Sequence, residues 1–294
     1  MYRCAIMAIL VTLSTLLSGC RVSGGLSGRS ATISRPTATS EPPPLPVGQT
    51  GNWRLVFQDE FEGAALDAQH WVTCYWWDKQ GCTIRTNREL EWYQPENVSV
   101  GDGVLKLHAQ QDKVDATDGK TYRYTSGMIS SGRQTSKTST PTKFSFTYGY
   151  AEIRAKVPKG KGLWPAFWLL PDDHTSKPEI DVMEVLGDQP HTVELRFHYR
   201  GPDGKTVNVG ESWSGPDFSA GWHTFAIDWQ PGALVWYVDG VERQRYADRS
   251  SIPAQPMYLI LNLAVGGNWP GSPDASTPFP SDYLVDYVRV WAKQ

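Results

Sequence analysis

Three carboxylates stand out in the segment KPEIDVMEVLG, residues 177–187. Glu179, Asp181 and Glu184 lie within an apolar run whose valine, isoleucine and methionine content predicts a buried strand. Burying a charge without a partner costs free energy, so acids in such a strand need a reason. Two carboxyl groups held close together can do glycoside chemistry, because in a retaining mechanism one attacks the sugar and the other serves as acid and then as base.

The spacing of these acids, two residues and then three, predicts an irregular strand. Side chains of a regular strand alternate between faces, so Glu179 and Asp181 share one face while Glu184 would point into the core. A β-bulge near Val182 and Met183 would return Glu184 to the face of the other two acids, on a concave sheet surface. Crowding would raise the pKa of the acid/base group and keep it protonated near neutrality. Taken alone, the string also fits an exposed strand with incidental acids, or a metal site.

Short strand-like runs separated by Gly and Pro surround the acidic segment, and helical periodicity is hard to find. The runs lie at residues 103–110, 148–157, 222–229, 233–240, 257–267 and 283–291. The residues from 222 to 240 predict a hairpin with Pro231 and Gly232 at its turn. The apolar run 257–267 predicts a strand buried on both faces. The fold class is therefore all-β, an antiparallel sandwich or jelly roll.

The first 20 residues have the features of an export signal. Arg3 precedes an apolar run that is too short for a membrane span. Its end, LSGC at Leu17–Cys20, resembles a bacterial lipobox, which implies cleavage before Cys20 and a lipid on its sulfur. Ordinary cleavage nearby, leaving a free cysteine, is the alternative. Because Arg21 is not the Asp of inner-membrane retention, we expect an outer-membrane or cell-surface lipoprotein, or otherwise a secreted or periplasmic protein.

The next segment, residues 21–50, is rich in Ser, Thr, Pro and Gly and poor in aromatic residues. Such a composition buries too little apolar surface to fold, so it predicts a disordered tether stiffened by prolines. Residues 51–294 then form the folded part, a length that suits one large all-β domain.

The charge and aromatic content narrow the class of partner. A net charge of −3 and a pI near 6.1, without a basic stripe, exclude a nucleic-acid-binding protein. All 13 Trp lie beyond residue 50, and the 13 Tyr add to them. Flat aromatic faces fill cores, and when exposed they also suit sugar rings.

Two cysteines remain inside the predicted domain, in the segment CYWWDKQGC. In an exported protein Cys74 and Cys82 are a candidate disulfide that closes a short loop. Two free buried thiols are the alternative. A zinc site is disfavoured because no matching His or Cys pair lies nearby.

Beyond these patterns, the string EIDVME at residues 179–184 resembles the bulged catalytic signature of glycoside hydrolase family 16, the laminarinase-type β-glucanases. Further segments resemble that family in the same order, namely FQDEFEG, NRELEWY, YGYAEIRAKVPKGKGLWPAFWLLP, GWHTFAIDWQPGALVWYVDG, MYLILNLAVGGNWPG and VDYVRVW. The resemblance implies a jelly roll of two antiparallel sheets with an open cleft. It also implies an endo-acting, retaining hydrolase of β-1,3- or mixed-linkage β-1,3-1,4-glucans with no catalytic cofactor. Glu179 would be the nucleophile and Glu184 the acid/base, with Asp181 orienting the nucleophile.

The resemblance also implies which side chains bind the glycan. Positions expected to line the cleft are Asn87, Trp164 and Trp269. His198, on the strand after the catalytic one, is a weaker candidate, with a structural histidine as the alternative. For Trp168 and Trp229 a place in the core is expected.

Members of the family often carry a structural calcium ion far from the chemistry. By analogy the ligands here would be Glu62, Gly103 and Asp286, and oxygen ligands of this kind suit calcium. The expected partners are the polysaccharide substrate and, through the lipid anchor only, a membrane. A monomer is the expected oligomeric state.

One departure from the family pattern lies just before the acids. Laminarinases commonly read W-P-x-x-G-E-I-D, whereas here Thr175 falls within the position of the Trp-Pro pair and Pro178 replaces the glycine. The aromatic residues 74–77 are a candidate substitute platform. A β-galactan or an exopolysaccharide therefore stays open as substrate, and transglycosylation stays open as reaction. A non-catalytic, lectin-like jelly roll is the alternative outside enzymes.

Overall fold

The computed structural model of the chain describes residues 43–77, 82–137, 139–173 and 175–294. The predicted signal, with its lipobox Cys20, and most of the predicted tether lie outside the described residues. Within the described ranges, we find no helix with the length and apolar character needed to cross a membrane.

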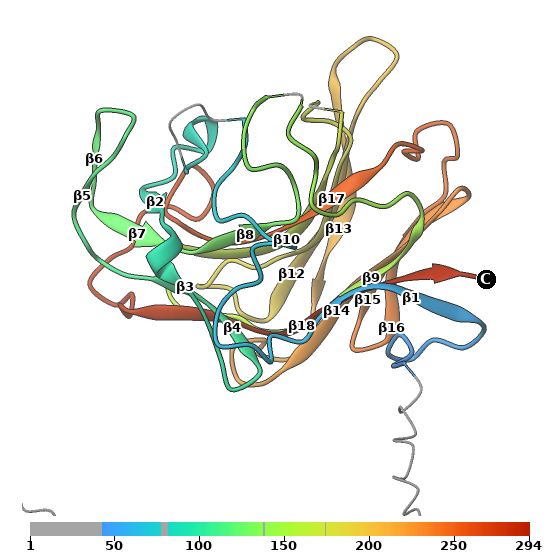
Figure 1. Cartoon of the computed structure of the whole chain (residues 1–294), viewed down its shortest axis with the longest axis horizontal. Coiled ribbons are helices and arrows are strands. Elements are labelled where there is room, and N and C mark those ends of the chain that lie inside the picture. Colours follow the sequence, from blue (N-terminus) through green and yellow to red (C-terminus); the bar gives the residue numbers. More distant parts are fainter. Residues whose placement is uncertain (1–42, 78–81, 138, 174) are drawn as a thin grey trace, which may run out of the picture. The chain divides into compact units, whose positions relative to one another are not determined.

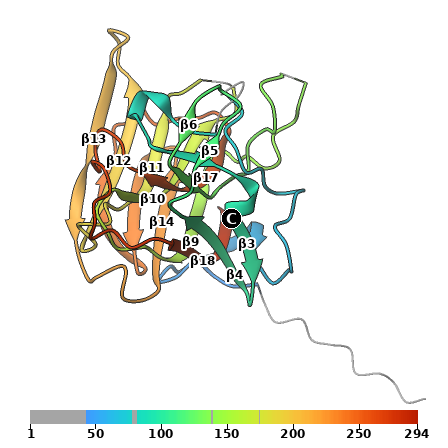
Figure 2. The same cartoon turned by 90° about the vertical axis from the view of Figure 1, so that its left-hand side faces the viewer.

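Two curved antiparallel sheets packed face to face make up the domain (Figures 1 and 2). The eight-stranded sheet contains, in spatial order, β16 (Val241–Tyr246), β15 (Ala233–Val238), β14 (His223–Gln230), β9 (Gly149–Lys156), β18 (Ser281–Lys293), β4 (Val104–Ala109) and β3 (Val98–Gly101), with β1 (Trp53–Asp59) paired to β18. The six-stranded sheet contains β13 (Thr206–Ser214), β12 (Thr192–Arg200), β11 (Glu179–Glu184), β10 (Leu163–Pro171), β17 (Met257–Val265) and β8 (Met128–Ser130). The predicted all-β antiparallel sandwich is confirmed.

Period-two alternation explains how these strands form one core. Along β12, Val193, Leu195 and Phe197 point inward and are fully buried, while their neighbours point to the other side of the sheet. The predicted hairpin is present as β14 and β15, which pair on either side of Pro231 and Gly232. β17 is buried along its whole length, as its apolar sequence predicts.

The remaining elements are short. They are the paired strands β2 (Glu91–Tyr93) and β7 (Tyr124–Ser126), the paired strands β5 (Val114–Asp115) and β6 (Thr121–Tyr122), and the 3₁₀ turns η1 (Arg85–Asn87) and η2 (Pro95–Asn97). The hairpin of β12 and β13 extends beyond its neighbours (Figure 1). β13 was not predicted, because this strand is largely polar and exposed on the sheet edge.

Residues 43–50, predicted as the end of the tether, pack on the outer face of the eight-stranded sheet. Trp291 Nε1 donates to Pro44 O at 2.8 Å, and the Val47 amide donates to Glu152 Oε2 at 3.2 Å. Gly48 has a φ of +71° and approaches Gly240 so closely that a Cβ would lie 2.5 Å from its carbonyl oxygen. Only a glycine fits there. The folded domain therefore begins near Pro43, several residues before the predicted boundary.

Candidate active site

The bulge in β11 places all three acids on one side of the sheet. Asp181 pairs with Trp168 of β10 and Met183 with Phe167, so Val182 is an extra residue with no partner on that strand. Against β12 the register also shifts between Asp181 and Glu184. Val182 and Met183 are both fully buried in the core between the sheets. The two-then-three spacing is thus accommodated by a bulge where it was predicted.

A hydrogen bond from the opposite sheet holds the bulge. The carbonyl oxygen of Asp181 accepts from Nε1 of Trp236 on β15, at 2.9 Å, in a fully buried position. A buried carbonyl without a partner would be costly, so the indole compensates for the irregular backbone. The core side of the sandwich therefore fixes the backbone beneath the acids.

An open cleft of about 970 Å³ lies over the six-stranded sheet, on the face turned away from the core. Glu179, Asp181 and Glu184 all line it. The predicted binding residues Asn87, Trp164, His198 and Trp269 line it as well. Side chains from separate parts of the chain are thus brought to one surface around the three acids.

Glu179 and Glu184 have different electrostatic surroundings. Burial raises the pKa of Glu179, and Asp181 raises it further, but Nζ of Lys177 lies 2.5 Å from Glu179 Oε2 and opposes the rise. Burial raises the pKa of Glu184 well above its usual value, and the charges of Asp181 and Glu179 add to this. Trp164 Nε1 donates to Glu184 Oε1 at 3.1 Å and offsets part of the rise. Glu184 is thus the group suited to remain protonated, and Glu179 has the ammonium partner of a carboxylate.

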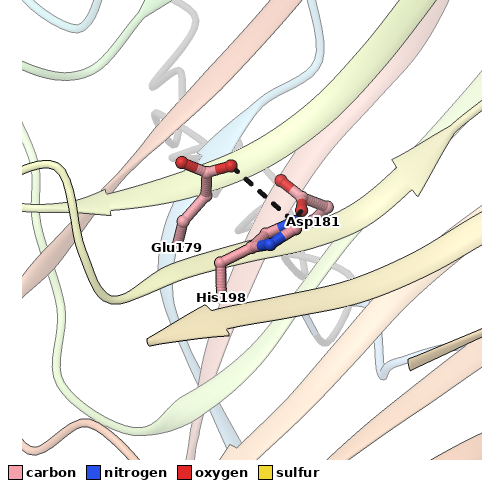
Figure 3. Close-up of side chains that lie close together, drawn as sticks. All are labelled: Glu179, Asp181 and His198. Atoms are coloured by element: carbon pink, nitrogen blue, oxygen red, sulfur yellow. Dashed lines mark ion pairs between the residues drawn. The ribbon is translucent and has the colours of Figure 1, made fainter. Parts of the chain in front are cut away.

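His198 converges on the acids from the neighbouring strand (Figure 3). Its Nε2 lies 2.8 Å from Asp181 Oδ2 and 3.9 Å from Glu179 Oε1, while Nδ1 lies 2.6 Å from Asn208 Oδ1. Burial lowers the pKa of His198, but contacts with Asp181, Asn208 and Glu179 together raise it above its usual value. The weaker sequence candidate therefore lies in the centre of the site, where an imidazolium can hold Asp181 in place.

The cluster of Glu179, Asp181 and His198 also has the size of a metal site, since one ligand atom from each lies within 4.8 Å of the others. The cations of the chain itself, Lys177 and His198, already face these carboxylates. We therefore assign the cluster to acid–base and nucleophilic chemistry.

The predicted calcium ligands lie on the other sheet. Glu62 and Gly103 are neighbours, because a Cβ on Gly103 would lie 3.4 Å from Glu62 Oε1. Asp286 follows Val285, which pairs with Leu105, two residues after Gly103. Asp286 Oδ2 accepts from Arg154 Nη1 at 2.7 Å. Glu62 and Gly103 thus lie together near the start of β4, whereas the Asp286 carboxylate is paired with an arginine, and calcium binding stays a prediction.

The two predicted sugar platforms contact each other in the cleft lining. Trp164 and Trp269 meet edge to face, with ring centroids 5.1 Å apart, and Trp269 is 44% exposed. Asn87 donates through Nδ2 to Glu89 Oε1 at 2.8 Å, and its carbonyl accepts from the amide of Asn268 at 2.8 Å. The loop that carries Trp269 is thereby attached to the segment that carries Asn87.

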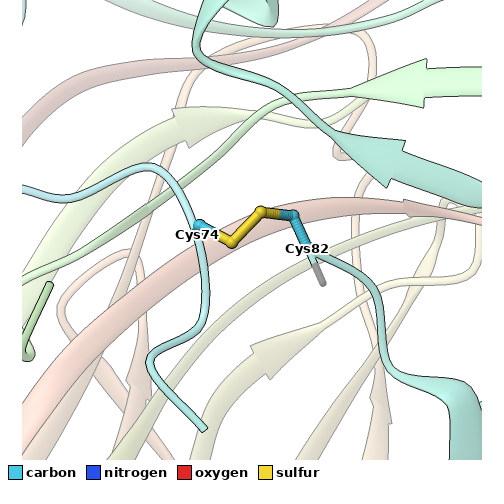
Figure 4. Close-up of a disulfide and its surroundings, with 2 residues drawn as sticks. All are labelled: Cys74 and Cys82. Atoms are coloured by element: carbon cyan, nitrogen blue, oxygen red, sulfur yellow. A yellow bond between two sulfur atoms is a disulfide. The ribbon is translucent and has the colours of Figure 1, made fainter. Parts of the chain in front are cut away.

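The aromatic segment 74–77 forms another part of the cleft lining. Cys74 and Cys82 are joined by a disulfide with 5.0 Å between their Cα atoms (Figure 4). Trp76 and Trp77 line the cleft, and Trp76 Nε1 donates to Tyr258 OH at 2.8 Å. The substitute platform expected from the sequence thus lies where a glycan can reach it; residues 78–81 of this loop lie outside the described residues.

The two tryptophans predicted for the core differ in position. Trp229 is fully buried between the sheets, as predicted, and donates to Pro253 O at 3.0 Å. Trp168 is buried too, but it belongs to a second apolar cluster on the cleft side and lines the cleft. Its Nε1 donates to Asn262 Oδ1 at 2.8 Å. Trp168 is thus buried in an apolar cluster, as predicted, and it also lines the cleft because period two on β10 gives it the face of Trp164 and not that of Phe167.

Several cleft residues were not predicted. The charged and polar ones include Lys177, Glu89, Glu194, Arg196 and Asn208. The alternation of β12 was a usable signal, because Glu194 and Arg196 share the face of His198. Lys177 gave no signal, since it lies in the loop before β11.

Comparison with known proteins gives a consistent result. A family model described as "Glycosyl hydrolases family 16" matches residues 86–289. The chain is 36% identical to "Endo-1,3-1,4-beta-glycanase EglC" of Rhizobium meliloti over 80% of this chain and 51% of the relative. It is 34% identical to the "Beta-glucanase" of Rhodothermus marinus, over 82% of this chain and 85% of that protein.

Among solved structures, the catalytic domain of an endo-1,3-beta-glucanase (laminarinase) from Thermotoga petrophila superposes with a TM-score of 0.72 at 34% identity. The match covers 83% of this chain and all of that domain. The chain spans only about half the length of EglC, and 38% of the Niallia circulans "Glucan endo-1,3-beta-glucosidase A1".

Proposed function

The chain belongs to family 16 of the glycosyl hydrolases, and from this we propose that it is a retaining, endo-acting β-glucanase. Its substrates are β-1,3-glucans or mixed-linkage β-1,3-1,4-glucans, the classes named for its relatives. One observation carries the proposal: a single bulged strand presents Glu179, Asp181 and Glu184 to one cleft, in surroundings that differ for the two glutamates.

In the first half-reaction, a carboxylate oxygen of Glu179 attacks the anomeric carbon of the sugar. The bond from that carbon to the glycosidic oxygen breaks, and Glu184 gives its proton to the departing oxygen. The raised pKa of Glu184 supports this role, because an acid must hold its proton at the working pH. Asp181, held by His198, lies between the two glutamates in the sequence and supports the charge changes on both.

In the second half-reaction, Glu184 takes a proton from water as the water oxygen attacks the anomeric carbon. The bond between Glu179 and the sugar breaks, and Glu179 returns to its carboxylate form. Two inversions give net retention of configuration. Trp164, Trp269, Trp76 and Trp77 offer aromatic rings for the neighbouring sugar units.

Release of reducing ends from laminarin and from a mixed-linkage glucan tests the proposal. The wild type should release them, while E179Q and E184Q should lose at least about 1,000-fold in rate, as expected for removal of a nucleophile or its acid. A protein that binds these glucans but cleaves none of a panel of β-glycans would be a lectin-like jelly roll. Product sizes by mass spectrometry separate hydrolysis from chain transfer, because transfer yields chains longer than the substrate.

Azide rescue tests the two roles separately. With an aryl β-glycoside, azide should restore turnover of E179A and give the α-glycosyl azide, because azide enters where the nucleophile was. With E184A it should give the β-azide, because azide then attacks the covalent intermediate. The opposite pattern would exchange the two assignments.

A structural calcium ion is part of the proposal. Glu62, Gly103 and Asp286 would hold it with oxygen donors, and it would brace the chain far from the cleft. We expect calcium to raise the melting temperature relative to EDTA in the wild type but not in D286N. An equal response in both proteins would remove Asp286 from the site.

Attachment through a lipid on Cys20 is proposed from the sequence of the first 20 residues. The mature protein would then be displayed on the outer membrane or cell surface. Full-length protein expressed in a Gram-negative host should partition into detergent, and C20S should not. Equal partitioning of both would favour a secreted or periplasmic protein.

A further inference from the structure

Lys177 contacts the nucleophile from outside the catalytic strand. It lies in the loop before β11, and its Nζ is 2.5 Å from Glu179 Oε2. Both side chains are largely shielded, with 19% and 21% exposed, and both line the cleft. A short contact between opposite charges in such a position is stronger than a surface ion pair.

The two oxygens of Glu179 have different partners as a result. Oε2 accepts from Lys177, while Oε1 has the more distant His198 Nε2 at 3.9 Å. A carboxylate held at one oxygen by a directed hydrogen bond loses rotational freedom and presents its other oxygen to the sugar.

We propose, building on the function above, that Lys177 is a positioning residue for the nucleophile: its ammonium holds Oε2 of Glu179, so Oε1 attacks the sugar, and it stabilises the carboxylate that leaves the covalent intermediate.

The effect differs between the two half-reactions. When Oε1 bonds to the anomeric carbon and the glycosidic bond breaks, Glu179 becomes a neutral ester and loses charge next to Lys177. When water attacks and the ester bond breaks, the electron pair returns to Glu179, and its negative charge develops beside the ammonium. Lys177 therefore favours the second step, and the protein without it should accumulate glycosyl-enzyme.

The charges around Glu179 agree with this role. Asp181 and Glu184 face it from β11, His198 from β12 and Tyr258 from β17. Of the two basic groups, Lys177 makes the closer contact with Glu179, at 2.5 Å against 3.9 Å for His198. Together with His198 it opposes the rise in the pKa of Glu179 that burial and Asp181 cause.

The first experiment needs no substrate. Carbon-13 NMR of protein labelled at glutamate carboxyls follows the titration of Glu179, whose signal is assigned by its loss in E179Q. K177M should move the midpoint up by about one pH unit, since a close opposite charge lowers a carboxyl pKa by about 1–3 units. K177R should keep the wild-type midpoint. Lys159 pairs with Asp217 at 3.2 Å on the surface, and K159M is the matched control without a shift.

The second experiment uses an aryl β-laminaribioside. K177M should show a burst of the aryl alcohol with kcat reduced about tenfold, the factor that corresponds to one pKa unit. The acidic limb of kcat/KM should move up with the NMR midpoint, and K177R should reverse both changes. An unshifted midpoint in K177M, or the same shift in K159M, would overturn the inference even in an active enzyme. A protein that cleaves no glucan would instead refute the proposed function and leave the titration result standing.

Discussion

Replacing Trp236 with phenylalanine removes the only indole donor in contact with the Asp181 carbonyl in the described part of the chain. Phenylalanine keeps an apolar ring in the core but cannot donate a hydrogen bond. The carbonyl at the bulge is then left buried and unpaired. Because Glu179 and Glu184 flank this peptide on the same strand, the catalytic geometry should relax along with the backbone.

The cost in stability has two parts. An unsatisfied buried carbonyl costs about 1–3 kcal/mol. The lost ring volume, about 30–40 Å³ at about 24 cal/mol per Å³, adds roughly 1 kcal/mol. The sum of roughly 2–4 kcal/mol corresponds to a fall in melting temperature of roughly 5–15 °C for a domain of this size.

Trp229 provides a matched control, since it is fully buried in the same core and its indole donates to Pro253 O at 3.0 Å, away from β11. W229F and W236F should lose similar stability in thermal unfolding. At a temperature where both are folded, W236F alone should lose about 10–100-fold in kcat on laminarin, the scale of a misplacement near 1 Å. If kcat of W236F stays within about twofold of W229F, the indole does not position the acids, and the reasoning about the bulge is refuted.

Three further predictions concern pH and the disulfide. D181N removes a charge that raises the pKa of Glu184, so the alkaline limb of kcat/KM should move to lower pH; an unmoved limb would contradict the coupling. Burial raises the pKa of Glu152 to about 7 from 4.5, so the unfolded chain loses this proton first as pH rises. The free energy of unfolding should therefore fall by about 3 kcal/mol between pH 4.5 and about 7 and level off above that range. In denaturant titrations E152Q should flatten this fall, and the same dependence of unfolding free energy on pH in E152Q and the wild type would contradict the prediction. The double variant C74S/C82S opens a loop with a sequence separation of 8, so the free energy of unfolding should fall by about 2–3 kcal/mol. Its KM on laminarin should rise, and an unchanged KM would show that the loop does not contribute to substrate binding.

The acids of β11 show what sequence can reveal about a site. Their spacing conflicts with period two, and a bulge is the small correction that resolves the conflict, so the face of Glu184 was predictable. β9 was predictable from its alternation, and β17 was predictable from its uninterrupted apolar run.

Two contacts were not predictable in this way. Trp236 meets Asp181 because two sheets pack at one particular register, which leaves no period in the sequence. Lys177 is only two residues from Glu179, but it lies outside β11, where strand alternation does not set the direction of a side chain. Trp168 shows a third limit, because a large aromatic side chain can be buried and still form the floor of a cleft.

The packing of residues 43–50 on the eight-stranded sheet has a practical consequence for presenting the domain on a support. Both ends of the folded part lie on that sheet, since Gln294 N donates to Asn52 O and β1 pairs with the end of β18. The cleft lies on the opposite outer surface, over the other sheet. A resin, a surface or a fused partner joined at either end of the domain would thus lie on the side away from the cleft. The cleft itself would stay accessible to a long polymer.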